Sequence, residues 1–196
     1  MNSFNKKKYN SLKGKFLISS PNISDPRFKK TLIYIISDNE SGTMGIIINK
    51  PALNIDLSIL LDEPHTDKNI IKPNIYYGGP VELDRGFILH TDDYSRNTNI
   101  TKLENNLALS SDITIMKDII KGLGPSKSIF TIGYTGWDSY QLHIEMNNNS
   151  WFEIDLETEI IFSRNYKSKW NLAIKKLGIN KKLLSSAIFS PHAGSA

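Results

Sequence analysis

Residues 75–91, IYYGGPVELDRGFILHT, combine residue types that could hold an anion. Gly78 and Gly79 can adopt backbone angles closed to other residues and let a bound group approach their amides, and Pro80 fixes the direction in which the chain leaves. Arg85 could supply the matching positive charge. We therefore predict a binding site for a negatively charged group in this segment.

Two neighbouring side chains leave other interpretations open. Asp84 beside Arg85 is also typical of a turn acid and a surface salt bridge. Strand alternation places His90 on the opposite face from Leu89, near the glycine pair, where its ring could act as an acid or a base. The alternative is an imidazole that bonds the backbone at a strand end. An enzyme using His90 or Asp84 is therefore an alternative function.

Several familiar chemistries are excluded or disfavoured by the sequence. Without cysteine there is no disulfide, thiol catalysis or cysteine-ligated zinc. The four histidines are far apart and form no HExxH motif, so no metal site and no cofactor is predicted. GLGPSKS at 122–128 follows a helix instead of a strand, which indicates a helix end and a turn. GYTG at 133–136 lacks the central Ser of a GxSxG elbow, so no catalytic residue is assigned.

Short strands must position these residues. The isoleucine-rich runs at 31–37 and 43–49 predict two strands that are buried on both faces or curled into a closed sheet. Two further runs, 75–77 and 86–89, are expected to form a hairpin around the glycine turn. The other expected strands are 15–20, 127–134, 151–154, 158–162 and one edge strand within 92–106.

Helical periodicity is clearest between Ser110 or Ser111 and Gly122, where apolar residues recur at helical spacing. Further helices are expected at 56–61, 137–146 and 169–177. This irregular succession of strands and helices favours an α+β fold over a strictly alternating parallel one. The aromatic residues Tyr134, Trp137 and Trp151 fit either a pocket wall or the core.

Length and composition are those of one soluble domain. The chain has 196 residues, 39% of them hydrophobic and 22% charged. Its apolar runs are far shorter than the roughly 20 residues that cross a bilayer. The apolar run after Lys6, Lys7 and Lys8 is too brief for a signal peptide. We expect a cytoplasmic protein that does not associate with membranes.

The net charge of +4 is concentrated at the two ends of the chain. Residues 1–30 hold eight bases and one acid, residues 163–196 hold seven bases and no acid, and the segment between them holds nine bases and nineteen acids. This distribution indicates solvated ends more than a continuous track for phosphates, so direct nucleic-acid binding is disfavoured. We expect a flexible basic arm at 1–13 and a single domain at 14–196.

Five blocks together resemble a known family. They are FLISSPNISDPRF, SGTMGIIINKP, GGPVELDRGFILHT, GYTGWDSYQL and the Trp151 that follows. In order and spacing they are similar to the bacterial AlgH/YqgE proteins. The resemblance implies a cytosolic α+β domain whose mostly antiparallel sheet curls into a barrel-like body with helices packed outside. The family is largely uncharacterised, and one branch has been tied to transcriptional control of alginate production without an evident DNA-binding motif.

The family has no established catalytic set, so its motifs carry over only as candidate pocket positions. These are Asp25, Pro26, residues 49–51 and 78–80, Arg85, Gly86, His90, Thr91, Tyr134, Gly136 and Trp137. Two departures are visible. Tyr140 stands where the family usually has Gly before its Gln-Leu pair, and the common Gly-His-Ala ending reads Gly-Ser-Ala at 194–196.

The leading hypothesis is a non-enzymatic binding or regulatory protein with a shallow pocket for a small anionic ligand or protein partner. A weakly nucleic-acid-associated transcriptional regulator is the second alternative, after the enzyme. The predicted ligand-binding residues are Asn49, Lys50, Gly78, Gly79, Pro80, Arg85, Gly86, His90, Tyr134 and Trp137.

Overall fold

The computed structural model describes residues 10–55, 74–96 and 99–178. The strands are β1 (Phe16–Ser19), β2 (Leu32–Asn39), β3 (Gly42–Ile47), β4 (Ile75–Tyr77), β5 (Val81–Thr91), β6 (Ile100–Lys102), β7 (Leu107–Ser110), β8 (Ser128–Asp138) and β9 (Trp151–Ile154). The helices are a 3-10 turn, η1 (Pro26–Phe28), and α2 (Ile113–Ile120), α3 (Gln141–Asn147), α4 (Glu159–Phe162) and α5 (Tyr166–Lys176). The helix expected at 56–61 lies outside the described residues.

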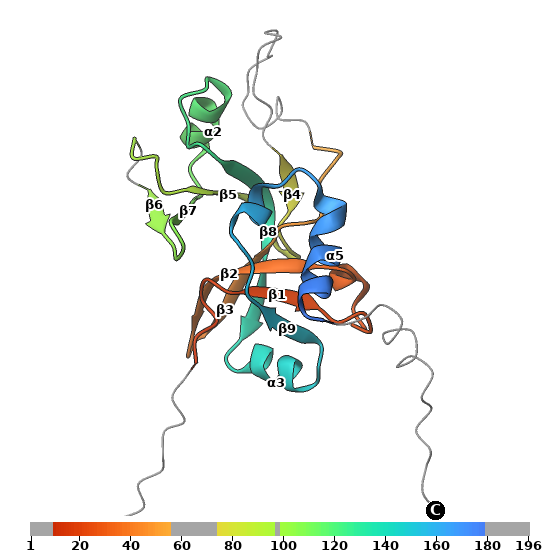
Figure 1. Ribbon diagram of the computed structural model, residues 1–196. Coiled ribbons are helices and arrows are strands. Elements are labelled where there is room, and N and C mark those ends of the chain that lie inside the picture. The colour runs from red at the N-terminus through yellow and green to blue at the C-terminus, as the bar shows by residue number, and fades with distance from the viewer. Residues whose placement is uncertain (1–9, 56–73, 97–98, 179–196) are drawn as a thin grey trace, which may run out of the picture.

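The nine strands form one strongly curled sheet in the order β6-β7-β5-β8-β3-β2-β1-β9, with β4 beside β8 (Figure 1). Neighbouring strands are antiparallel, and the pair of β4 with β8 is parallel. The long strand β8 joins the two halves of the curl, because its first part pairs with β5 and its last part with β3. The α+β class and the curled, mostly antiparallel sheet are confirmed, although the curl is a half-barrel.

The hairpin expected between β4 and β5 is wrong. Both strands pair with β8, on opposite edges, so the chain crosses β8 at Gly78 and Gly79. The Gly78 amide donates to the Ile132 carbonyl, and the Gly78 carbonyl accepts from the Ile47 amide, each at 2.8 Å. A Cβ on Gly79 would lie 2.1 Å from the Tyr134 carbonyl carbon, and Gly79 has φ +156°. Glycine is needed here because two backbones cross in direct contact.

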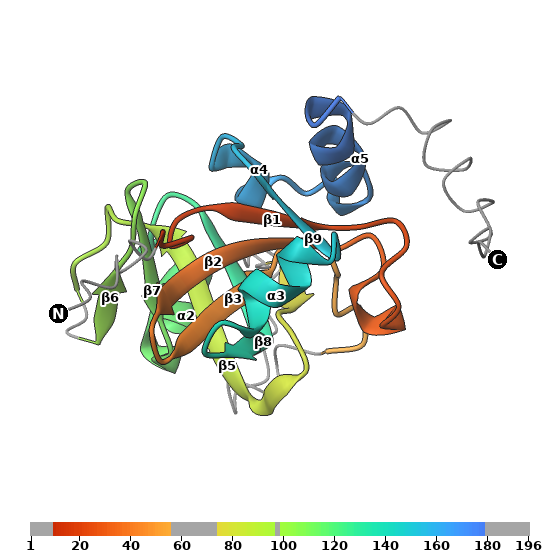
Figure 2. The same ribbon diagram turned by 90° about the horizontal axis from the view of Figure 1, so that it is seen from below.

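The isoleucine-rich strands are buried on both faces, as their composition predicts. On one face, Ile18, Tyr34 and Ile46 belong to a large core that also includes Trp170 and Ile174 of α5. The opposite face of the same strands contributes to a second core, which contains Leu17, Ile33, Ile35, Ile47, Trp137, Leu142 and Trp151. Figure 2 shows α5 and α3 on different sides of these strands.

The remaining sequence predictions have mixed outcomes. The strands at 15–20 and 151–154, the edge strand and the helices that became α2 and α5 are confirmed. The strand expected at 158–162 is wrong, because these residues form the short helix α4, in which Ile161 is buried. Trp137 lies in β8, paired with Thr43 of β3, and α3 begins only at Gln141. The change of direction occurs at Tyr140, whose φ of +61° is left-handed.

Candidate functional site

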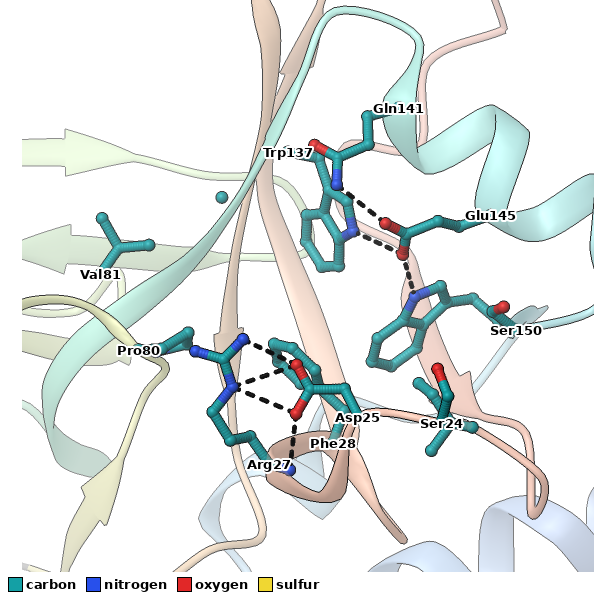
Figure 3. A pocket seen from close by; sticks show the side chains of 13 residues that line it. Ser24, Asp25, Arg27, Phe28, Pro80, Val81, Trp137, Gln141, Glu145 and Ser150 are labelled. Carbon is teal, nitrogen blue, oxygen red and sulfur yellow. Dashed lines mark hydrogen bonds and ion pairs between the residues drawn. The ribbon is translucent and has the colours of Figure 1, made fainter.

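A cavity of about 500 Å³ lies at the end of β8 that carries Trp137, between the 23–28 segment and α3 (Figure 3). Its lining comes from segments far apart in the sequence: Ile23, Ser24, Asp25, Arg27, Phe28, Pro80, Val81, Gly136, Trp137, Gln141, Glu145, Ser150 and Trp151. Four of the five sequence blocks that resemble the family therefore meet at one cavity. The chain topology brings them together, since the crossing at Gly79 delivers Pro80 to the end of β8 that carries Gly136 and Trp137.

Three aromatic rings form the floor of the cavity. Trp137 and Trp151 meet edge to face with centroids 5.7 Å apart, and Phe28 meets Trp151 in the same way at 5.5 Å. Trp137 is 7% exposed and Trp151 2%, so the indoles form a floor and do not project into solvent. Such a floor can hold an apolar or aromatic body by contact with ring faces and edges.

Glu145 of α3 fixes the orientation of the two indole rings by accepting a hydrogen bond from each. One of its carboxylate oxygens accepts the indole N–H of Trp151 at 2.7 Å and that of Trp137 at 3.1 Å (Figure 3). Its other oxygen accepts the Gln141 amide at 2.9 Å. A carboxylate already bonded by three donors is poorly suited to act as an acid or base, so we assign Glu145 a positioning role.

The opposite edge of the cavity carries an arginine held by an aspartate. Arg27 donates from Nε and Nη2 to the Asp25 carboxylate, with Nη2 2.7 Å from Oδ2. The hydrogen bond from Arg27 lowers the pKa of Asp25, and Asp25 in turn raises the pKa of Arg27. In the part of the chain that the structure describes, Arg27 Nη1 has no hydrogen-bond partner. This two-point hold fixes the plane of the guanidinium and leaves one amino group for a ligand.

Lys50 adds a second positive charge at this edge. Its ammonium group donates to the backbone carbonyl of Arg27. Burial lowers the pKa of Lys50, and the nearby Asp25 charge opposes that effect. The group formed by Asp25, Arg27 and Lys50 thus carries one net positive charge when all three are ionised, which favours an anion at this edge of the cavity.

Six of the ten predicted ligand-binding residues fall into three sets. Pro80 and Trp137 line the cavity, and Lys50 contacts its Arg27 edge. Gly78 and Gly79 form the backbone crossing described above. Asn49 is 8% exposed and joins two backbone segments, accepting from the Leu32 amide at 2.9 Å and donating to the Lys30 carbonyl at 2.8 Å.

Arg85 does not line this cavity. It forms an exposed ion pair with Glu82 at 3.0 Å and places its guanidinium 5.0 Å from the Phe87 ring centroid. Tyr134 donates its hydroxyl to the same glutamate at 3.2 Å. Gly86 provides close packing, because a Cβ there would lie 2.6 Å from the Phe130 ring. These contacts account for Arg85, Gly86 and Tyr134 as parts of the β5–β8 pair.

His90 and Asp84 do not contribute to the lining of the cavity. The His90 ring is fully buried, with Nδ1 2.7 Å from the Thr91 carbonyl oxygen and the Tyr94 ring at 6.2 Å. Its Nε2 has no partner among the described residues, and burial lowers its pKa. Asp84 lies on the exposed segment of β5. Neither residue lines the cavity.

Arg27, Phe28, Gln141 and Glu145 line the cavity, although they were not among the residues predicted from sequence. Asp25 and Pro26 were named only through the family resemblance. One local signal was available: Asp-Pro-Arg predicts a turn with an acid and a base two residues apart, which is where the ion pair forms. Glu145 gave no such signal, because its two indole partners come from separate strands.

The fold and the site define a class of protein: a curled antiparallel sheet with outer helices, in which widely spaced motifs line one aromatic-floored cavity. A family model described as AlgH-like matches residues 16–182, so the chain belongs to the AlgH-like family.

Individual relatives agree with this assignment. The chain is 36% identical to a UPF0301 protein of Ruegeria pomeroyi over 179 residues, covering 90% of this chain and 97% of the relative. A UPF0301 protein of Rickettsia canadensis is 40% identical over 182 residues, covering 92% and 96%. The solution structure of the AlgH protein from Pseudomonas aeruginosa superimposes with a TM-score of 0.74 at 32% identity, covering 100% of both chains.

Two further observations concern the described residues. No helix within 10–55, 74–96 and 99–178 is long and apolar enough to cross a membrane. The same ranges contain no group of three or more His, Asp or Glu side chains placed to hold a metal ion.

Proposed function

We propose that this AlgH-like chain is a binding protein with a regulatory role, and that its cavity receives a small organic anion. The observation that carries the proposal is the convergence of the family-like blocks on a single cavity that has an aromatic floor and a charged edge. An apolar or aromatic body would contact Trp137, Trp151 and Phe28, and its carboxylate or phosphate would bond Arg27 Nη1.

The distribution of charge supports an anion at the Arg27 edge and not at the floor. Glu145 lies at the floor, where its negative charge repels a second anion, while Arg27 and Lys50 outweigh Asp25 at the edge. A ligand with its charge at one end matches this polarity. Because the cavity is partly open, contacts to the rings and the arginine have to supply most of the affinity.

The test compares aromatic carboxylates with their neutral amides. Benzoate and phenylacetate, paired with benzamide and phenylacetamide, are titrated into the protein by calorimetry and by NMR of backbone amides and indole N–H groups. We expect the carboxylates to shift the indole signals of Trp137 and Trp151, and the amides to bind more weakly. Loss of one charge-assisted hydrogen bond predicts roughly tenfold weaker carboxylate binding to Arg27→Gln.

Arg85→Gln is a matched control. Like Arg27, Arg85 is exposed, pairs with a nearby acid and lies near a phenylalanine ring. The proposal predicts unchanged binding to Arg85→Gln. Shifts confined to residues 78–90, with binding lost in Arg85→Gln and kept in Arg27→Gln, would overturn it and restore the glycine-loop site expected from sequence.

The two alternatives receive less support. An enzyme based on His90 needs a ring that substrate can reach, whereas this ring is fully buried. Transcriptional regulation through DNA contact would depend on the basic ends, of which residues 1–9 and 179–196 lie outside the described chain. A regulatory role through a bound small anion requires neither.

A further inference from the structure

A second cavity, of about 410 Å³, is lined by residues that follow α2 and begin β8. Figure 1 shows α2 at this end of the sheet. The cavity lining combines the 122–128 segment with residues before β4 and at the end of α4: Asn74, Ile119, Gly122, Gly124, Pro125, Ser126, Lys127, Ser128, Phe162 and Arg164. Residues 122–128 are the GLGPSKS segment, for which the sequence predicted only a helix end and a turn. We propose that this cavity is a separate binding site for a phosphate-bearing small molecule.

The charge of the lining carries the proposal. Among the described residues that line the cavity, Lys127 and Arg164 are the ionisable ones, and both are cationic. Lys127 has only a loose ion pair with Glu159, at 3.8 Å, in which the two side chains are 48% and 68% exposed. Such a pair holds little of the lysine's charge. Arg164 has no ion-pair partner in the described ranges. Two weakly compensated cations attract a multiply charged oxyanion.

Neutral polar residues also line this cavity. Ser126 and Ser128 contribute hydroxyl groups, and Asn74 contributes a side-chain amide. A phosphate monoester has three terminal oxygens that can accept these bonds together with those from Lys127 and Arg164, whereas a carboxylate has two. Phe162 and Ile119 provide apolar surface for an organic substituent. The lining thus matches a phosphate ester better than a carboxylate.

The 122–128 segment is held in a defined shape before any ligand binds. The Lys127 amide donates to the Thr91 hydroxyl at 3.2 Å, and the Thr91 amide donates to the Lys127 carbonyl at 3.1 Å. The Ser126 amide donates to the Asp93 carboxylate at 3.2 Å. Gly124 lies so close to α2 that a Cβ there would be 2.8 Å from Ile119 Cα. This preorganisation reduces the entropy lost when a ligand binds.

Two local features disfavour the binding of an anion in this cavity, and the effect of each is small. The cavity borders the carboxyl end of α2, where the helix dipole is negative. However, the amides of Lys121, Gly122 and Leu123 already bond the carbonyls of Lys117, Ile119 and Asp118. The second feature is the negative charge of Asp93, which accepts from the Ser126 amide, and of Glu159, which lies 3.8 Å from Lys127; neither acid lines the cavity.

The test uses phenyl phosphate, inorganic phosphate, benzoate and phenol as probes, titrated into the full chain by NMR of backbone amides. We expect phenyl phosphate to shift the amides of Gly124, Ser126, Lys127 and Ser128, and phenol to leave them unchanged. Inorganic phosphate should shift the same amides with lower affinity. Lys127→Gln and Arg164→Gln should each weaken phenyl phosphate binding by about tenfold, because each removes a charge-assisted contact.

Two control variants make the result specific. Lys102→Gln changes another exposed lysine in an ion pair, with Asp92 at 3.0 Å, and should leave the affinity unchanged. Arg27→Gln should also leave unchanged the affinity that is followed at the amides of Gly124, Ser126, Lys127 and Ser128, which separates this site from the cavity of the proposed function. The inference is overturned if Lys102→Gln weakens binding as much as Lys127→Gln does, if phenol shifts the same amides, or if phenyl phosphate shifts only residues around Arg27.

Discussion

The Glu145 carboxylate accepts the indole N–H of Trp151 at 2.7 Å, which joins α3 to β9 below the floor of the larger cavity. The same oxygen accepts the indole N–H of Trp137 at 3.1 Å. One helix residue therefore fixes two rings that belong to different strands. The floor depends on this carboxylate, although Glu145 is itself partly exposed.

Replacing Glu145 tests how much these two hydrogen bonds contribute to stability. Glu145→Ala leaves two nearly buried indole N–H groups without their acceptor, so we expect the free energy of unfolding to fall by about 2–4 kcal/mol. Urea unfolding followed by tryptophan fluorescence measures the change. Glu40→Ala removes an exposed acid at the β2–β3 turn and should cost less than about 0.5 kcal/mol. Equal losses in the two variants would contradict the assigned role.

Because of the backbone crossing, we expect alanine at Gly79 to reduce stability far more than alanine at Gly136. Gly79→Ala would place Cβ 2.1 Å from the Tyr134 carbonyl carbon, so we expect a loss above about 4 kcal/mol or no folded protein. Gly136→Ala meets its nearest atom, in the Tyr134 ring, at 3.4 Å and should cost about 1 kcal/mol or less. Thermal unfolding of both variants checks this. A well-folded Gly79→Ala protein would mean that the crossing is looser than described.

Tyr140 occupies a backbone conformation that suits glycine, the residue the family resemblance leads us to expect there. Its φ is +61° and the residue is 56% exposed. Tyr140→Gly should raise the free energy of unfolding by about 1 kcal/mol, because the left-handed strain is removed. Tyr140→Ala retains a Cβ and should bring no gain. Chemical denaturation of the two variants separates conformational strain from loss of the aromatic ring.

The buried Lys169 leads us to expect that the stability of the protein changes with pH above neutrality. Its side chain is fully buried, donates to the Ile48 and Ile161 carbonyls at 2.7 and 2.8 Å, and lies 4.8 Å from the Tyr76 ring centroid. Burial lowers the pKa of Lys169 to about 7 from its ordinary 10.5. Between these values the unfolded chain binds the additional proton. Stability should therefore rise with pH over this window, by at most about 1.4 kcal/mol per pH unit.

Urea unfolding between pH 6 and pH 10 measures this slope in the wild type and in Lys169→Met. The methionine variant should lack the lysine's contribution at every pH. Lys175→Met, which alters an exposed lysine of the same helix, should retain the wild-type slope. A slope that persists in Lys169→Met would assign the alkaline dependence to another group.

The buried His90 leads us to expect a second pH dependence of stability, below neutrality. The ring is buried, Nδ1 lies 2.7 Å from the Thr91 carbonyl oxygen, and burial lowers the pKa below its ordinary 6.5. As pH falls below about 6.5 the unfolded chain takes up a proton that the folded chain resists, so stability should decrease. His90→Leu should remove this contribution between pH 7 and pH 5, whereas His143→Gln should retain it. Denaturation curves at half-unit pH steps give the comparison.

Local pattern was sufficient for most elements and insufficient for their partners. The β-branched runs at 31–37 and 43–49 predicted two strands, and these strands pair with each other because the turn between them is short. The glycine turn after β4 suggested a second hairpin, yet β4 pairs with β8, more than fifty residues later in the chain. Pattern within a segment cannot encode that choice, since many strands offer equivalent backbone groups.

The sequence by itself determined the α+β class, the double-sided burial of the central strands, the absence of cysteine chemistry and the family, because these follow from composition, periodicity and ordered motifs. Only the tertiary structure decided that Arg27, Glu145 and two tryptophans border one cavity while Arg85 and His90 lie elsewhere. The physical reason is long-range backbone pairing: the pairs β1–β9 and β3–β8 and the crossing at Gly79 join segments far apart in sequence, and no local signal reports such contacts.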